Sequence, residues 1–241
     1  MKFEAWCLSD KGLRRDSNQD ACLINRGLGL FIVADGMGGH SGGEVASSLA
    51  VEMVQKTFKD VENQKLPPRE ILSKAYEVAS QKIYDKAAKE SPELAGMGTT
   101  MVVAYLRENS IYIGNIGDSR SYLFRKPYLW QITEDHSLLN EQLRAGLLTE
   151  EQGKNFIGRN VITRSVGYER EVHPDILERQ IEPGEIYLIC SDGLSGLVSD
   201  EKISQIMNNN PPEKIAKICV DQALANGGDD NVTVLILHFL K

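Results

Sequence analysis

Four aspartates of this chain stand at one end of an apolar run, beside a glycine or an asparagine. They lie in the segments Val33-Ala34-Asp35-Gly36, Asn115-Ile116-Gly117-Asp118, Cys190-Ser191-Asp192-Gly193 and Gly228-Asp229-Asp230-Asn231, and a fifth, Asp20, precedes another apolar run. Carboxylates that meet at strand ends repel one another unless a cation compensates their charge. Mg²⁺ and Mn²⁺ take oxygen ligands and keep several waters. The pattern predicts a site for hard divalent cations, although each Asp-Gly or Asp-Asn pair taken alone is also a common turn.

The glycine-rich segment from Gly36 to Gly43 offers a second interpretation, a cradle for a nucleotide phosphate. It lacks the Gly-Lys-Ser/Thr ending of a P-loop and does not fit the Gly-x-Gly-x-x-Gly turn of dinucleotide-binding proteins. Asp35, which precedes it, would repel a phosphate unless a metal ion came between them. The segment therefore favours a metal site over a nucleotide site.

Apolar runs and helical periodicity predict the elements that would position these aspartates. We expect strands at 3–9, 20–26, 29–34, 101–106, 110–116, 121–125, 128–132, 186–190 and 232–240, and helices at 44–58, 68–89, 200–207 and 211–225. The polar segment 136–160 lies between strands and is expected to form a partly helical flap. Helices come in pairs and strands in groups, which favours a layered α+β sandwich over a doubly wound sheet. With no repeat or long linker, residues 1–241 are expected to form a single catalytic domain.

Composition and charge limit the classes of partner. The chain has 241 residues and a formal net charge of -7, which argues against binding to nucleic acid or to an anionic membrane surface. No apolar run reaches the roughly 18 residues needed to span a bilayer, and the first residues lack the apolar core of a signal peptide. The four cysteines show no zinc-ligand spacing and are expected to be buried free thiols. We expect a cytoplasmic monomer.

A series of short motifs resembles the metal-dependent protein phosphatase family, the type 2C serine/threonine phosphatases, and most closely its compact bacterial branch. The motifs are Arg15-x-x-Asn18-Gln19-Asp20, Val33 to His40, Gly96 to Thr100, Gly117-Asp118-Ser119-Arg120, Asp135-His136-Ser137, Ile162-Thr163-Arg164, Ser191-Asp192-Gly193-Leu194 and Asp230-Asn231-Val232-Thr233. They occur in the order of the family and cover nearly the whole chain. The resemblance implies a four-layer α-β-β-α sandwich, in which two antiparallel sheets are flanked by helix pairs.

The resemblance also assigns the metal ligands. Asp35 resembles the carboxylate that bridges two core Mn²⁺ or Mg²⁺ ions, and the Gly36 carbonyl would bind one of them. Asp192 and Asp230 match further ligands of the second core ion. Asp118 matches the aspartate that, with Asp192, holds a third and weaker ion in bacterial members. Asp20 resembles a residue of the metal site that holds metal-bound water.

Two further residues would act on the substrate. Arg15 matches the arginine that binds phosphate, for which its planar guanidinium is suited. The histidine proposed as general acid in eukaryotic relatives is replaced here by Met37, and His40 is the nearest candidate for that role, although it could equally be a turn residue. The flap carries Phe156 to Asn160 where many bacterial relatives have a His-Pro pair. We interpret His136 as structural.

The implied reaction is hydrolysis of phosphoserine and phosphothreonine in proteins, which would be targets of a Ser/Thr kinase. Cys190 is not followed by the Cys-x₅-Arg loop of cysteine-based phosphatases, so a water between two cations would attack the phosphorus. A catalytically silent phosphoprotein-binding module would lack core acids, and Asp35, Asp192 and Asp230 are all present. A metal phosphodiesterase or nucleotide hydrolase would mix histidine ligands with acids, and the histidines here lack such spacing.

Overall fold

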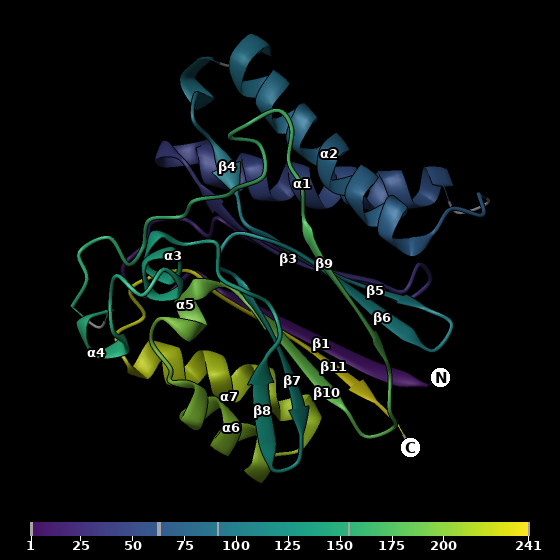
Figure 1. The fold of residues 1–241 in the computed structure, drawn as a ribbon, viewed down its shortest axis with the longest axis vertical. Helices are drawn as coiled ribbons and strands as arrows, with labels where there is room; N and C mark the ends of the chain where they lie inside the picture. Colours follow the sequence, from purple (N-terminus) through teal and green to yellow (C-terminus); the bar gives the residue numbers. More distant parts are fainter. Residues whose placement is uncertain (1, 62–63, 91, 154, 241) are drawn as a thin grey trace.

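Two antiparallel sheets form the centre of the molecule (Figure 1). The computed structural model describes residues 2–61, 64–90, 92–153 and 155–240, except for the side chains at 40, 41, 90 and 92. The first sheet contains, in spatial order, β1 (Phe3–Asp10), β11 (Val232–Phe239), β10 (Ile186–Cys190), β7 (Arg120–Arg125) and β8 (Tyr128–Gln131). The second contains β2 (Asp20–Asn25), β3 (Leu30–Met37), β5 (Met101–Arg107), β6 (Ser110–Ile116) and β9 (Asp175–Gln180), with the short β4 (Gly98–Thr99) paired to β3.

Helix pairs cover the outer faces of the two sheets (Figure 1). Helices α1 (Gly39–Val61) and α2 (Pro68–Asp85) pack on the second sheet. Helices α6 (Asp200–Asn209) and α7 (Pro212–Ala225) pack on the first. The predicted α-β-β-α sandwich is confirmed. Within the described ranges, no helix is both long enough and apolar enough to cross a membrane.

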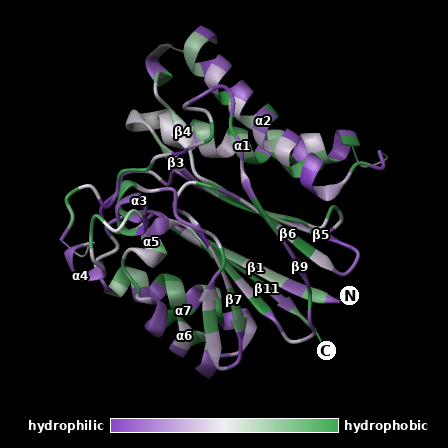
Figure 2. Cartoon of the chain, in the orientation of Figure 1, coloured by the Kyte–Doolittle hydropathy of each residue, from purple (hydrophilic) through white to green (hydrophobic). Residues whose placement is uncertain are grey.

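Burial on both faces explains the composition of the strands. In β1, Ala5 and Cys7 face the other sheet, whereas Trp6 and Leu8 face the helices, as the two-residue period of a strand requires. Strands with helices on one side and a sheet on the other are apolar on both faces, and every residue of β6 and β10 is buried. Figure 2 shows apolar residues along the strands, while the outer helices carry both apolar and polar residues.

Most predicted elements are confirmed within a few residues, but α1 begins at Gly39 rather than near residue 44. Glycine disfavours helix formation, so the sequence pattern hides this start. The packing explains it. A Cβ on Gly43 would lie 2.6 Å from the Gly36 carbonyl oxygen, and one on Gly42 would lie 3.1 Å from Cβ of Met97. Only glycine lets the first turns of α1 pass so close to β3 and to the segment before β4.

Some other features differ from the sequence-based expectation, and the flap agrees with it. The helix predicted to reach residue 89 is α-helical only to Asp85 and continues as a π-helical turn, Lys86–Glu90. Strand β9 was not predicted. The flap is partly helical as expected, with the short helices α3 (Leu138–Arg144) and α4 (Glu150–Gly153). Cys190 and Cys219 are buried free thiols as expected, whereas Cys7 and Cys22 are only partly buried.

Candidate metal centre

The predicted carboxylates come from the ends of strands in both sheets. Asp20 is the first residue of β2 and pairs in register with Asp35 near the end of β3. Asp118 lies in the turn between β6 and β7. Asp192 follows β10 at the start of the short helix α5 (Asp192–Ser195), and Asp230 lies two residues before β11. Residues separated by up to about two hundred positions in sequence thus meet at one end of the sandwich.

Mutual repulsion and burial perturb these groups. Burial and the neighbouring charges of Asp20 and Asp192 raise the pKa of Asp35 well above its usual range. Burial, with the charges of Asp192 and Asp135, raises the pKa of Asp118 to about 7. Burial also raises the pKa of Asp20 to about 6, although a hydrogen bond from Ser191 Oγ to its Oδ2 (2.8 Å) opposes the shift. Such a cluster is costly for the protein alone and favourable around a cation.

Unsatisfied oxygens show that the cluster suits a divalent ion. Within the described part of the chain, one buried carboxylate oxygen in each of Asp20, Asp118 and Asp192 has no hydrogen-bond partner. Oxygen donors of this kind fit Mn²⁺ or Mg²⁺. Among the described residues, however, no three acidic, cysteine or histidine side chains are arranged to hold one ion by themselves. Mg²⁺ retains several waters and needs only one or two carboxylates, so the donor set fits an ion that keeps much of its hydration shell.

Three of the carboxylates have close neighbours of their own within the cluster. The carboxyl groups of Asp35 and Asp192 lie close together, and each shifts the pKa of the other. The carboxylate of Asp230 accepts a hydrogen bond from Arg15 Nη2 at 2.7 Å. The ion pair between Arg15 and Asp230 therefore helps to hold this edge of the cluster in place.

Two threonines, Thr99 and Thr100, fix the main chain at Asp35. In the sequence they stand out only as part of the motif from Gly96 to Thr100. The Asp35 carbonyl accepts hydrogen bonds from Thr99 Oγ1 and from the Thr100 amide, both at 2.8 Å. The Asp35 amide donates to Thr100 Oγ1 at 3.2 Å. A Cβ on Gly36 would lie 2.0 Å from the Gly43 carbonyl oxygen, so this position is restricted to glycine. Asp35 and Gly36 are thus rigidly placed before any ligand binds.

Arg15 lies beside the cluster on an exposed loop. Its side chain is 53% exposed and lines a hollow of about 310 Å³ together with Gln19 and Asn231. Asn231 holds this loop in place: its Oδ1 accepts from the Gln19 amide at 2.7 Å, and its Nδ2 donates to the carbonyls of Lys11 (2.8 Å) and Ser17 (2.9 Å). Sequence reasoning missed this role of Asn231, because it depends on where the loop lies in the fold.

Of the two histidines near the predicted site, His40 and His136, the structure describes the side chain of His136. His40 falls in the first turn of α1, but its side chain lies outside the described residues. His136 is buried, and its Nδ1 accepts a hydrogen bond from the Gly117 amide at 3.0 Å. The structural interpretation of His136 is confirmed, because it supports the turn that carries Asp118.

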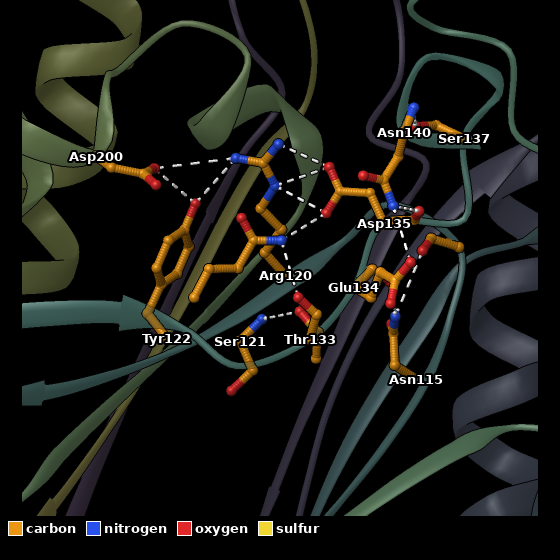
Figure 3. A network of polar contacts seen from close by, with 12 residues as sticks. Asn115, Arg120, Ser121, Tyr122, Thr133, Glu134, Asp135, Ser137, Asn140 and Asp200 are labelled. Carbon is orange, nitrogen blue, oxygen red and sulfur yellow. Dashed lines mark hydrogen bonds and ion pairs between the residues drawn. The ribbon is translucent and has the colours of Figure 1, made fainter. Parts of the chain in front are cut away.

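A polar network connects the start of β7 to the base of the flap (Figure 3). Arg120, at the start of β7, donates from Nε and Nη2 to both carboxylate oxygens of Asp135 at 2.7–3.0 Å. Its Nη1 donates to the hydroxyl of Tyr122 at 3.1 Å, and that hydroxyl donates to Asp200 at the start of α6. The network fixes the segment after β8 against the first sheet.

Two separate cavities lie near this region. One of about 180 Å³ is bordered by Asp118, Asp192 and the flap residue Arg159, so the flap forms part of the wall of the acidic site. A larger one of about 500 Å³ lies between Met37 and Arg164 and contains none of the clustered carboxylates. Two of the carboxylates with an unsatisfied oxygen, Asp118 and Asp192, border the smaller cavity.

Comparison with known proteins identifies the family. A family model described as protein phosphatase 2C matches residues 13–211. The chain belongs to the protein phosphatase 2C family. Among relatives of the 2C type, it is 37% identical over 240 residues to protein phosphatase PhpP of Streptococcus pneumoniae, covering 98% of this chain and 97% of that protein. It is 35% identical over 237 residues to the serine/threonine phosphatase stp of Listeria monocytogenes, covering 95% of this chain and 93% of that protein.

Solved structures of the 2C type share the whole fold. The Mycobacterium tuberculosis serine/threonine phosphatase PstP/Ppp superposes with a TM-score of 0.91 at 34% identity, covering 99% of both chains. The catalytic domain of PstP in complex with two manganese ions gives a TM-score of 0.87 at 33% identity, also covering 99% of both chains. The prediction of a metal-dependent phosphoprotein phosphatase of the bacterial type is confirmed by these relatives.

Proposed function

We propose that this member of the 2C family hydrolyses phosphoserine and phosphothreonine in proteins with water, at a site for two Mn²⁺ or Mg²⁺ ions and a weaker third. The observation that carries the proposal is the buried carboxylate cluster, three of whose members keep an oxygen with no partner among the described residues. A phosphoprotein-binding module without activity would not need to maintain so unfavourable a group of charges.

The cluster divides into ligands of the core ions and of the weaker ion. Asp35 would bridge the core pair with the Gly36 carbonyl on one ion, and Asp192 and Asp230 would complete the other. Asp118 would share the third ion with Asp192. When bound, the cations lower the pKa of a water and offset the negative charge of the phosphoryl group. Asp20, hydrogen-bonded to Ser191 Oγ at 2.8 Å, would use its unpaired Oδ1 to hold and orient water.

Arg15 would bind the non-bridging oxygens of the phosphate. Its ion pair with Asp230 places the guanidinium at the edge of the cluster, and its exposure leaves donors free to face solvent. The planar guanidinium of an arginine matches the geometry of phosphate oxygens. Because the Arg15 side chain is already exposed, a phosphate could reach it without displacement of the loop that Asn231 holds. His40, at the start of α1, is our candidate for protonating the leaving alkoxide.

The substrate protein would also contact the flap at 136–160, which borders the acidic cavity. We propose that residues 1–241 act as one catalytic domain and as a monomer, on proteins phosphorylated by a Ser/Thr kinase. Met37 and the flap segment Phe156 to Asn160 stand where other members of the family carry histidines. The activity of this chain would therefore not require a histidine at either place.

The test compares two variants on two substrates. We expect Asp35→Ala to lose most hydrolysis of p-nitrophenyl phosphate and of a phosphothreonine peptide in saturating Mn²⁺, and EDTA to abolish the wild-type activity. Asp221→Ala, an exposed carboxylate on α7, is the matched control and should keep full activity. Turnover by Asp35→Ala close to that of the control would contradict the proposed site.

A further inference from the structure

Two partly buried cysteines from different sheets face each other. Cys7 lies in β1 of the first sheet and Cys22 in β2 of the second. Their sulfur atoms are 2.7 Å apart, and both side chains pack against the apolar layer between the sheets. Neither takes part in the proposed hydrolysis. The sequence alone did not pair them, because 15 positions separate the two residues and the pairing depends on how the sheets pack.

Hydrogen bonds on both sides keep the two strands opposite each other. Toward the metal centre, Asn18 Nδ2 donates to Ser9 Oγ at 2.8 Å. Toward the other end, Arg26 Nη2 donates to the Ala5 carbonyl at 2.9 Å. The sulfur pair lies between these two contacts, so the thiols do not need a large backbone movement to approach bonding distance.

Access separates this pair from the other two cysteines. Cys190 and Cys219 are fully buried and lie in the layer between the first sheet and its helices. Cys7 and Cys22 are only partly buried, so they are more accessible to a small oxidant than Cys190 and Cys219. Thiol oxidation is selective for accessible sulfurs, and two adjacent thiols can resolve each other's oxidation products.

We propose that Cys7 and Cys22 form a reversible dithiol–disulfide site that links the two sheets beside the metal centre. With a low-molecular-weight disulfide as oxidant, the Sγ–Sγ bond between Cys7 and Cys22 forms and the S–S bond of the oxidant breaks. Two electrons and the two thiol protons pass to the oxidant, which leaves as two small thiols. In a reducing compartment the pair is reduced, and such pairs there act as redox sensors more often than as structural links.

The new bond would close a loop that carries residues of the proposed site, including Arg15 and Asp20. Closing a loop of about 15 residues restricts the unfolded chain, so the oxidised protein should have a Tm higher by roughly 5–10 °C. Asn231 already fixes the same loop in the folded state. We therefore expect the kcat for p-nitrophenyl phosphate to be unchanged, and this part of the inference rests on the proposed function.

The experiment titrates the full chain with oxidised glutathione in Mg²⁺, which has no redox chemistry of its own. Trypsin then cuts after Lys2, Lys11, Arg15 and Arg26, giving peptides 3–11 and 16–26 with one cysteine each. We expect mass spectrometry to find these two peptides joined with the loss of two hydrogens, the Tm to rise, and dithiothreitol to reverse both changes. The matched variants Cys7→Ser and Cys22→Ser should instead carry glutathione on the remaining thiol and show no rise in Tm.

Three results would overturn the proposal. Glutathione on Cys7 or Cys22 of the wild-type protein, without joined peptides, would show that the pair cannot close. Joined peptides with an unchanged Tm would show that the bond does not restrict the chain. Loss of most turnover on oxidation, with the metal-dependent activity of the reduced protein intact, would show that the bond displaces the loop. Inactivity of the reduced protein would count against the proposed function and leave the peptide and Tm results to judge the disulfide.

Discussion

Replacing Arg120 tests whether the network in Figure 3 stabilises the fold. The side chains of Arg120 and Asp135 are only 25% and 15% exposed, and the guanidinium donates three hydrogen bonds to that carboxylate. Arg120→Ala leaves Asp135 partly buried, with Gln131 Nε2 still donating to it at 2.8 Å. Removing one partner of a buried pair costs about 3–5 kcal/mol, and the remaining donor and partial exposure reduce this to about 2–4 kcal/mol.

That loss converts into a measurable change in Tm. For a chain of this size, 1 kcal/mol corresponds to about 2–4 °C, so Arg120→Ala should lower the Tm by roughly 5–15 °C in thermal denaturation followed by circular dichroism. Arg144→Ala is the control: it breaks the Arg144–Glu134 pair, whose side chains are 68% and 45% exposed. Exposed pairs contribute little, so its Tm should fall by only about 1–3 °C.

A second variant separates charge from packing. Arg120→Met combined with Asp135→Leu removes both charges and should recover much of the Tm lost in Arg120→Ala, because the double change leaves no uncompensated carboxylate. Equal Tm values for Arg120→Ala and Arg144→Ala would refute the reasoning, since the buried network would then contribute no more than an exposed ion pair.

Three other substitutions test the proposed roles. Arg15→Ala should raise the KM for a phosphopeptide by about tenfold or more, with metal affinity by calorimetry unchanged; a fall in metal affinity at constant KM would mean that Arg15 acts through Asp230. Asp118→Ala should keep both core ions but lose turnover at low Mn²⁺, and an unchanged Mn²⁺ titration would remove the third ion. Phe156→Ala should change phosphoprotein hydrolysis more than p-nitrophenyl phosphate hydrolysis, whereas equal losses would mean that the flap supports the core site.

The elements that the sequence predicted well are those buried on both faces. The runs at 29–34 and 186–190 are apolar throughout, so the strands ending near Asp35 and Asp192 could be found without a structure. Strand β9 is an edge strand with polar and apolar residues mixed, and Leu177 within it is 38% exposed. No apolar run marks it. The start of α1 was missed for a different reason, since its glycines serve tertiary packing against local preference.

The convergence of the carboxylates did not follow from spacing. Asp20 and Ser191 are hydrogen-bonded although 171 positions separate them, and this contact requires the start of β2 and the end of β10 to lie at the same side of the sandwich. Only the ordered motifs of the family implied it. The pairing of Arg15 with Asp230 was also absent from the sequence analysis, because it depends on how Asn231 positions the loop.

The carboxylate cluster also links the folding of this chain to the supply of divalent cations. The unfolded chain disperses these aspartates, so a cation that binds only the folded state adds to its stability, by about 2.7 kcal/mol at a concentration 100 times its Kd. Withdrawal of the ion at that concentration would raise the unfolded fraction by about 100-fold. Cells degrade unfolded chains continuously, and small changes in stability alter protein abundance. We therefore expect manganese or magnesium starvation to reduce the amount of this phosphatase as well as the rate of each molecule.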